Sequence, residues 1–102
     1  MNICNFTGFL THDLKLEVVD GVSFVRFELV VYSYRKTKVG DKSKTPTYLY
    51  FEAWHTGAET IAKLAKKGNK ITVFASAKNV SKDDASIVFR VNEFDFACLE
   101  SD

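Results

Sequence analysis

The chain has 102 residues, of which 46% are hydrophobic and 26% charged, and its formal net charge is +1. That length suits one self-sufficient hydrophobic core, and we expect no second domain. No apolar run approaches the roughly 20 residues that span a bilayer, and the N-terminus lacks the pattern of a secretory signal, so we expect a soluble cytoplasmic protein.

The first half of the chain has the alternation typical of strands. In chain order, we predict a strand at 2–10, a short strand at 16–19, a long strand at 22–34, a basic hairpin loop at 35–46 and a strand at 48–54. Gly8 interrupts the first strand, and Asp20-Gly21 is a hairpin signal between the second and third.

The second half of the chain predicts one helix and two more strands. Thr56 and Glu59 fit a capping box at the start of the helix, and Gly68 supplies its stop. The expected segments that follow are a strand at 70–77, a polar loop at 78–86 and a last strand at 87–98. The apolar parity of this last strand flips at Asn92-Glu93, which predicts a bulge.

The parity of two strands leaves aromatic rings off the core face. The core faces consist of Leu49, Phe51 and Ala53, and of Val25, Phe27, Leu29 and Val31. The opposite faces carry Tyr48, Tyr50, Glu52 and Trp54, and Phe24, Arg26, Glu28, Val30, Tyr32 and Tyr34. Flat rings beside cations on a sheet can stack on nucleobases of any sequence.

Charge is unevenly distributed along the chain. Residues 34–48 have a balance of +4, residues 63–82 contain six lysines and no acid, and the last twenty residues sum to −5. This separation is compatible with a surface for a polyanion, although charge runs are usually solvated loops.

The residues that bind metals or carry redox chemistry are scattered. Cys4 and Cys98 lack C-x-x-C spacing, so we expect two reduced, largely buried thiols. His12 and His55 stand alone, without ligand or base spacing. We therefore expect neither a metal nor another cofactor.

The predicted elements have the order of an OB-fold, in which five strands form a Greek-key barrel with a helix between the third and fourth. We predict an all-β barrel with one helix over residues 1–99, followed by a short C-terminal end at 100–102. The second and third strands of such barrels commonly bind oligonucleotides, although a fold alone does not specify function.

An ordered set of motifs runs along most of the chain. It comprises Asn2, Gly8-x-Leu10-Thr11 with Asp13, Phe27-x-Leu29, Trp54-x-x-x-Ala58-Glu59 and Lys66-Lys67-Gly68. In this set the chain resembles the bacterial and phage single-stranded DNA-binding proteins, known as SSB. The resemblance implies non-enzymatic, sequence-independent binding of single-stranded DNA in replication, recombination and repair. It also implies a cytoplasmic protein of a bacterial cell, phage-infected or not, that forms a homotetramer, with a homodimer as the alternative.

The resemblance further implies that rings at matching positions stack on bases. Trp54 is the motif tryptophan, Tyr48 lies where the family has Trp or Phe, and Tyr34 lies close to another family aromatic. The full set of candidate nucleic-acid-binding residues is Tyr34, Tyr48, Trp54, Tyr50, Tyr32, Phe74, Arg26, Arg35, Lys36, Lys38, Lys42 and Lys44. The competing expectations are that Trp54 packs on the helix, and that Tyr32 and Phe24 lie in a subunit interface.

The chain also departs from the family. Leu14 replaces a proline, Ala75 replaces a glycine, and the segment 78–86 is short and lacks an aromatic residue. The glycine-, glutamine- and proline-rich tail with its acidic tip is missing after Leu99. We expect a short phage or plasmid form, or a trimmed one, that contacts other replication proteins without such a tail.

Two other classes of function stay open. One is an interaction protein resembling primosomal replication protein N, which also binds single-stranded DNA but mainly bridges replication proteins. The other is an enzyme on the same barrel, such as a nuclease. No cluster of carboxylates with arginine, metal spacing or nucleophile arrangement is visible, so we predict no enzyme.

Overall fold

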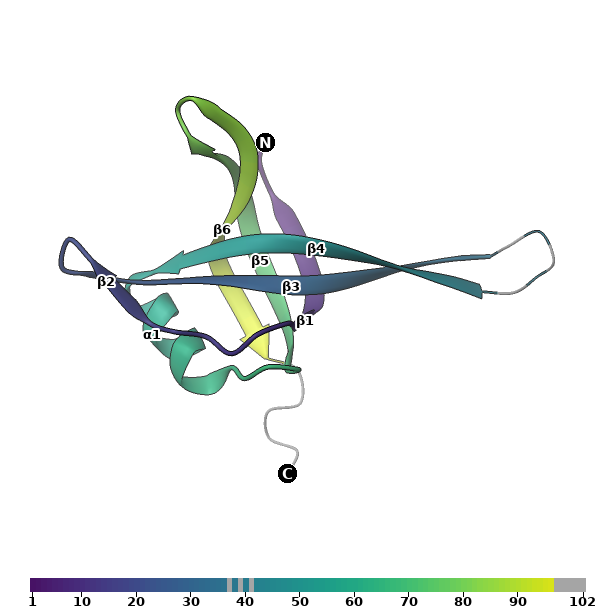
Figure 1. Cartoon of the computed structure of the whole chain (residues 1–102), viewed down its shortest axis with the longest axis horizontal. Coiled ribbons are helices and arrows are strands. Elements are labelled where there is room, and N and C mark those ends of the chain that lie inside the picture. The colour runs from purple at the N-terminus through teal and green to yellow at the C-terminus, as the bar shows by residue number, and fades with distance from the viewer. Residues whose placement is uncertain (37, 39, 41, 97–102) are drawn as a thin grey trace.

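Figure 1 shows the computed structural model of the chain. It describes residues 1–36, 38, 40 and 42–96, except for the side chains of Arg35, Lys36 and Lys42. The elements are β1 (Cys4–Leu10), β2 (Glu17–Val19), β3 (Val22–Lys36), β4 (Lys42–Trp54), α1 (His55–Leu64), β5 (Lys70–Ser81) and β6 (Asp84–Phe96).

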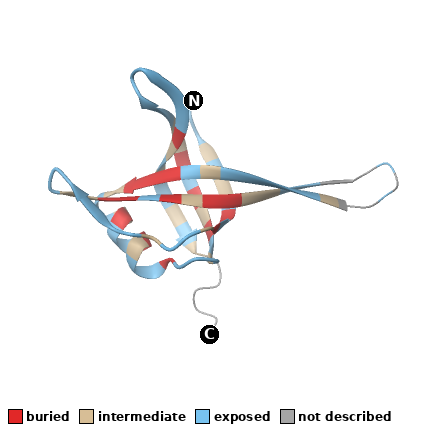
Figure 2. Ribbon diagram, in the orientation of Figure 1, coloured by how far each residue is buried: buried red, intermediate tan, exposed pale blue. Residues whose placement is uncertain are grey.

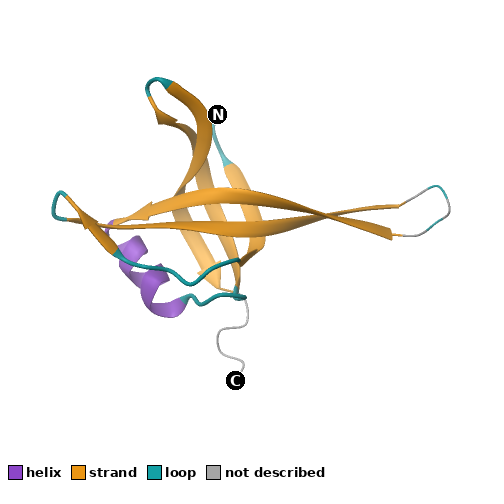
Figure 3. Cartoon of the chain, viewed as in Figure 1, coloured by secondary structure: helices purple, strands orange, loops and turns teal. Residues whose placement is uncertain are grey.

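The five long strands close into a barrel. Their order is β1–β5–β6–β4–β3, and β1 closes the ring by pairing with β3 through Phe9–Val30 and Leu10–Leu29. Every pairing is antiparallel except that of β4 with β6. The short β2 adds only to one end of β3, and α1 lies between the third and fourth long strands (Figure 3). The predicted OB-fold is therefore confirmed.

The inward side chains of the barrel form one apolar core. The largest fully buried side chains are Phe51, Leu29, Ile61, Ile71, Val25 and Val73, and buried positions concentrate where the strands cross in Figure 2. Burying a side chain of this size contributes roughly 1.5–3 kcal/mol. The core parity predicted for β3 and β4 holds at Phe27 and Ala53, which are buried as well. It fails at Val30, which was expected on the opposite face but is buried where β1 pairs with β3.

Two local predictions are confirmed at the predicted residues. Asp20 and Gly21 both have positive φ, at 51° and 79°, as a tight hairpin turn between right-twisted strands requires. Phe74 pairs with Glu93 while Ala75 pairs with Val91, so Asn92 is the extra residue of a β-bulge. The Asn92 amide donates to Ser76 Oγ at 3.0 Å and thereby satisfies the bulged side chain.

Two hairpins are longer than the sequence predicted. The segment 35–46 was expected to be a loop, but β3 runs to Lys36 and β4 starts at Lys42, so that a two-stranded ribbon leaves the barrel (Figure 1). The prediction failed because proline usually interrupts a strand. Here Pro46 pairs with Tyr32 in a two-stranded ribbon, and at the free edge of such a ribbon the missing N–H leaves no hydrogen bond unmade. The expected loop at 78–86 is likewise mostly strand, with β5 ending at Ser81 and β6 starting at Asp84.

The start of the helix also differs from the prediction. α1 begins at His55, which has a φ of 62°, and the N-cap position is Trp54 without a side-chain cap. The capping box of Thr56 and Glu59 is therefore wrong. The Glu59 carboxylate instead accepts a hydrogen bond from Ser23 Oγ at 2.6 Å, because α1 packs against β3. The helix ends at Leu64, before the predicted stop at Gly68.

Gly8 allows β1 to approach β3 closely, and this yields a test of the closed barrel. A Cβ at Gly8 would lie 2.7 Å from the Val30 carbonyl oxygen, which is backbone. We expect Gly8→Ala to lower the free energy of unfolding by about 1–3 kcal/mol, as overpacking does. Urea denaturation measures the loss. Gly57→Ala is the matched control, because its Cβ would meet only Phe94 at 3.7 Å. Equal stability of the two variants would contradict the close approach of β1 and β3.

Candidate nucleic-acid interface

One continuous strip of side chains covers the outside of β3 and β4, and we call it the outer face. The antiparallel register sets its side chains in pairs, namely Phe24–Trp54, Arg26–Glu52, Glu28–Tyr50, Val30–Tyr48, Tyr32–Pro46 and Tyr34–Lys44. Successive pairs on one face of a strand lie about 7 Å apart. The outer face therefore presents an aromatic ring at almost every step.

Three tyrosines of the outer face are open to solvent. Tyr34 is 67% exposed, Tyr48 57% and Tyr50 55%. Tyr32 is half-buried, and the Lys44 ammonium lies 3.9 Å from the centre of its ring. This cation–π contact holds a positive charge on the outer face next to the exposed rings.

Trp54 is half-buried at the barrel end of the outer face. Its ring packs against the buried Phe24, with centroids 4.4 Å apart, and its Nε1 donates to Glu52 Oε2 at 3.3 Å. The Arg90 guanidinium lies 5.9 Å from the indole ring. Trp54 therefore packs against Phe24 of the neighbouring strand β3, and Phe24 is covered within this chain.

Glu52 is the main departure from the parity pattern. Its position predicts an outward side chain, yet the residue is only 4% exposed. The carboxylate accepts a hydrogen bond from Lys78 Nζ at 3.0 Å, and Arg90 Nε lies 3.9 Å away. A buried carboxylate needs such partners because it has lost its hydration. It therefore holds a lysine of β5 and an arginine of β6 beside β4.

Lys78 and Arg90 are residues of the site that sequence reasoning missed. The signal that could have found Arg90 is the parallel register of β4 and β6, which sets Glu52 opposite Arg90. Sequence spacing does not carry that signal, because the two strands are separated by α1 and β5.

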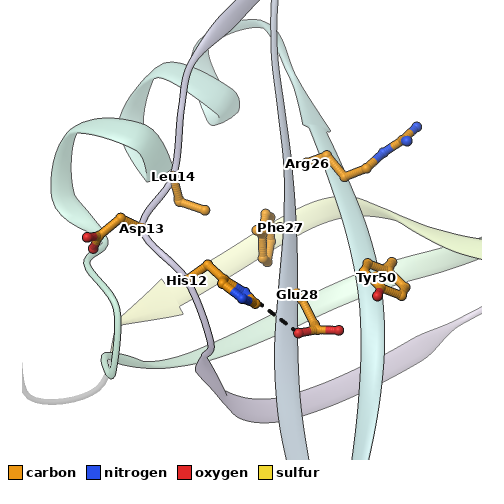
Figure 4. Close-up of a pocket in the computed structure, with 7 residues that line it drawn as sticks. All are labelled: His12, Asp13, Leu14, Arg26, Phe27, Glu28 and Tyr50. Atoms are coloured by element: carbon orange, nitrogen blue, oxygen red, sulfur yellow. Dashed lines mark ion pairs between the residues drawn. The ribbon is translucent and has the colours of Figure 1, made fainter.

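Two hollows flank the middle of the outer face. One, of about 180 Å³, lies between the outer face and the segment 12–14 (Figure 4). The other, of about 290 Å³, lies between the outer face and the β5–β6 hairpin, and its lining includes Val80 and Ile87. Arg26 and Tyr50 line both hollows. The outer face therefore has walls on both sides, as expected of an oligonucleotide groove in this fold.

Glu28 stands in the first hollow at the centre of a polar cluster. Thr11 Oγ1 donates to Glu28 Oε1 at 2.7 Å, and His12 Nδ1 lies 3.8 Å from the same oxygen. The hydrogen bond of the Tyr50 hydroxyl with Glu28 raises the pKa of Tyr50. The negative charge of the Glu28 carboxylate and partial loss of hydration raise it further. The Tyr50 hydroxyl points toward the carboxylate (Figure 4).

The segment that walls the first hollow is fixed to the barrel. Thr11 N–H donates to the Glu28 carbonyl at 3.1 Å, and Asp13 Oδ1 accepts from the Lys67 N–H at 3.0 Å. Asp13 and Lys67 both belong to the motifs that suggested the family resemblance. Their contact gives these two motifs a structural role, because it holds one wall of the groove in place.

The other predicted site residues fall into two groups. Lys38 is exposed in the ribbon turn, whereas the side chains of Arg35, Lys36 and Lys42 lie outside the described part of the structure. Phe74 is 39% exposed on β5, between Asn5 of β1 and Glu93 of β6, and is therefore not on the outer face. The structure thus brings together Arg26, Tyr32, Tyr34, Lys44, Tyr48, Tyr50 and Trp54.

The structure also bears on metal binding, on the cysteine thiols and on membrane-spanning helices. Among residues 1–36, 38, 40 and 42–96, no three potential metal ligands of the His, Cys, Asp or Glu type come together. Cys4 is a half-buried free thiol, and Cys98 lies outside the described residues. Within the same described part, no helix has the length and apolar character needed to cross a membrane.

Glu52→Gln tests the buried ion pairs. The amide keeps the size of the side chain but leaves Lys78 and Arg90 beside a neutral group, so we expect a loss of about 1–3 kcal/mol in the free energy of unfolding. Urea denaturation followed by the emission of Trp54, the single tryptophan, measures it. The exposed Glu17 of β2 provides the matched control, Glu17→Gln, for which we expect a change within about 0.5 kcal/mol. A larger loss in the control than in Glu52→Gln would contradict this role of Glu52.

Comparison with known proteins gives structural matches only. No family model matches the chain, and no curated protein matches its sequence. The single-stranded DNA binding protein from Thermus aquaticus has a similar structure, with a TM-score of 0.81 and 18% identity over 95% of this chain. A deletion mutant of that protein gives a TM-score of 0.79 and 19% identity, again over 95% of this chain. The small single-stranded DNA-binding protein from Streptomyces coelicolor gives 0.76 and 13% identity, over 95% of both chains.

The coverage of these matches differs. The chain spans 50% of each Thermus aquaticus chain, so it corresponds to about half of that protein's length. At these identities the matches establish the shared OB-fold.

Proposed function

We propose that this chain is a non-catalytic protein that binds single-stranded DNA along the outer face. The observation that carries the proposal is the row of exposed tyrosines, Tyr34, Tyr48 and Tyr50, on a sheet surface with a hollow on each side. The fold supports it as well, because the Thermus aquaticus and Streptomyces coelicolor proteins of this fold are single-stranded DNA-binding proteins.

Binding combines two interactions. The tyrosine rings stack on unpaired bases, and each stacked base contributes roughly 1–3 kcal/mol whatever its sequence. Arg26 and Lys44 attract the phosphates from positions beside those rings, and Lys38 adds a charge in the ribbon turn. A duplex stacks its bases on one another, so their faces are not accessible to the tyrosines. The outer face therefore prefers single strands.

The finer role follows from that activity. By coating exposed single strands, the protein would protect and organise DNA during replication, recombination and repair in the bacterial cytoplasm. Its gene would belong to a phage, a plasmid or a chromosome. We further propose that the chain forms a homo-oligomer, a tetramer or a dimer. Exposed apolar side chains near the N-terminus support this, since Ile3, just before β1, is 67% exposed and Phe9, in β1, is 39% exposed.

Tyr48→Ala combined with Tyr34→Ala tests the stacking. Removal of two exposed rings should weaken the binding of labelled oligo(dT) at least tenfold, given roughly 1–3 kcal/mol for each stacked base. Fluorescence anisotropy at fixed salt measures the affinity. Tyr48→Phe with Tyr34→Phe is the matched control, because it keeps both rings and should bind like the original chain. Affinity unchanged in the alanine variant would remove these rings from the site.

Phe74→Ala decides how far the interface extends around the barrel. Phe74 lies on β5, off the outer face, so we expect a smaller loss of affinity there than at Tyr48. A loss as large as that of Tyr48→Ala would instead include β5 in the DNA path, as the sequence predicted.

The salt dependence of binding tests the cations. Replacing Arg26 and Lys44 by Gln removes two phosphate contacts, so the slope of log K against log salt should fall in magnitude by about 0.7 for each cation with a single strand. Lys63→Gln, in the last turn of α1, is the control and should leave the slope unchanged. An unaltered slope in the double variant would assign Arg26 and Lys44 to the general surface.

A further inference from the structure

Two carboxylates, Glu28 and Glu52, stand among the rings of the outer face. A carboxylate repels the phosphates of a nucleic acid, so the presence of each of these two residues on a DNA-binding face has to be explained. Glu52 is buried and paired with Lys78 and Arg90, so its negative charge is compensated within the barrel. Glu28 is different, because among the described residues its only charge partner within 4.0 Å is His12.

The Glu28 side chain is 15% exposed, so only part of its carboxylate can be reached by a ligand. Oε1 accepts a hydrogen bond from Thr11, which fixes the side chain in one orientation. Oε2 is on the side of Tyr50, in the hollow of about 180 Å³ between the outer face and the segment 12–14 (Figure 4). The two oxygens of a carboxylate accept about four hydrogen bonds in total, so acceptor sites remain beside those used by Thr11 and the Tyr50 hydroxyl.

A base stacked on Tyr50 would present its edge to this carboxylate. Tyr50 is directly opposite Glu28 on the neighbouring strand, its ring is 55% exposed, and both line the same hollow. The ring therefore supplies the stacking surface and the carboxylate supplies an acceptor beside it. Tyr50 would hold any base by stacking, whereas the Glu28 carboxylate would hydrogen-bond only to bases with a donor at that edge, so the pair can distinguish one base from another.

We infer that Glu28 reads the base stacked on Tyr50 and favours bases that carry amino groups, guanine above all, over thymine. This inference rests on the proposed function and adds a base preference to it. An ionised carboxylate only accepts hydrogen bonds. Guanine offers two adjacent donors, N1–H and the 2-amino group, and cytosine and adenine each offer one amino group. Thymine offers N3–H between two carbonyl oxygens, which repel the carboxylate.

The preference for guanine changes the affinity only modestly, because most of the outer face binds bases of any sequence. It acts at one position, whereas stacking on Tyr34 and Tyr48 acts on every base alike. We expect an alternating oligonucleotide of guanine and thymine to bind about tenfold more tightly than oligo(dT) of the same length, as a hydrogen bond to a charged group typically allows. Replacing guanine by hypoxanthine, which lacks the 2-amino group, should remove about half of that advantage on a logarithmic scale.

The test uses the full chain and fluorescence anisotropy at one salt concentration. Purines stack better than pyrimidines, so a single affinity does not isolate the effect of Glu28. The decisive quantity is the affinity for the guanine–thymine oligonucleotide divided by the affinity for oligo(dT), measured for the original chain and for Glu28→Gln. The amide offers both a donor and an acceptor, so it accepts thymine, and the ratio should fall at least threefold. Glu93→Gln, an exposed carboxylate of β6, is the matched control and should leave the ratio unchanged.

Each outcome has a definite meaning. A ratio in Glu28→Gln equal to that of the original chain overturns the inference while leaving the proposed function intact. Equal affinity for guanine and hypoxanthine oligonucleotides overturns it as well, and this comparison needs no variant to fold. Failure of the folded chain to bind any oligonucleotide refutes the proposed function and the inference together.

Discussion

The antiparallel ladder between β3 and β4 is the constraint on which the rest depends. It runs from Phe24–Trp54 to Lys36–Lys42, and its register decides which side chains enter the core and which reach solvent. A slip of one residue would send Tyr48 and Tyr50 inward and expose Phe51, which is fully buried. The burial of the core therefore also fixes the row of exposed rings. Structure and proposed function have the same physical origin in this strand pair.

Much of the fold could be predicted because it follows from local chemistry. The alternation of β3 and β4, the turn at Asp20-Gly21 and the bulge at Asn92 each depend on residues adjacent in sequence. The length of the β3–β4 hairpin could not be predicted, because Pro46 is a strand breaker except at a free edge. The helix start was missed because Glu59 bonds to Ser23, a partner on β3.

The candidate site shows the same division. The positions of its rings follow from parity, whereas its charges depend on contacts between distant segments. Glu52 looks like a surface residue in sequence, but Lys78 and Arg90 surround it once β5 and β6 join the barrel. Glu28 acquires its fixed orientation from Thr11, which precedes β2. Electrostatics on this outer face is thus a tertiary property, and it separates Glu52, which is buried among cations, from Glu28, which lines a hollow.

The central claim is that single-stranded DNA lies along the outer face. Titration of the isotope-labelled chain with a short oligo(dT), followed by amide chemical shifts, tests it most directly. The account predicts that the largest shifts fall on Tyr34, Tyr48 and Tyr50 and on the walls of the two hollows, with small changes in α1. Shifts confined to α1 or to the exposed side of β1, with the outer face unchanged, would contradict it.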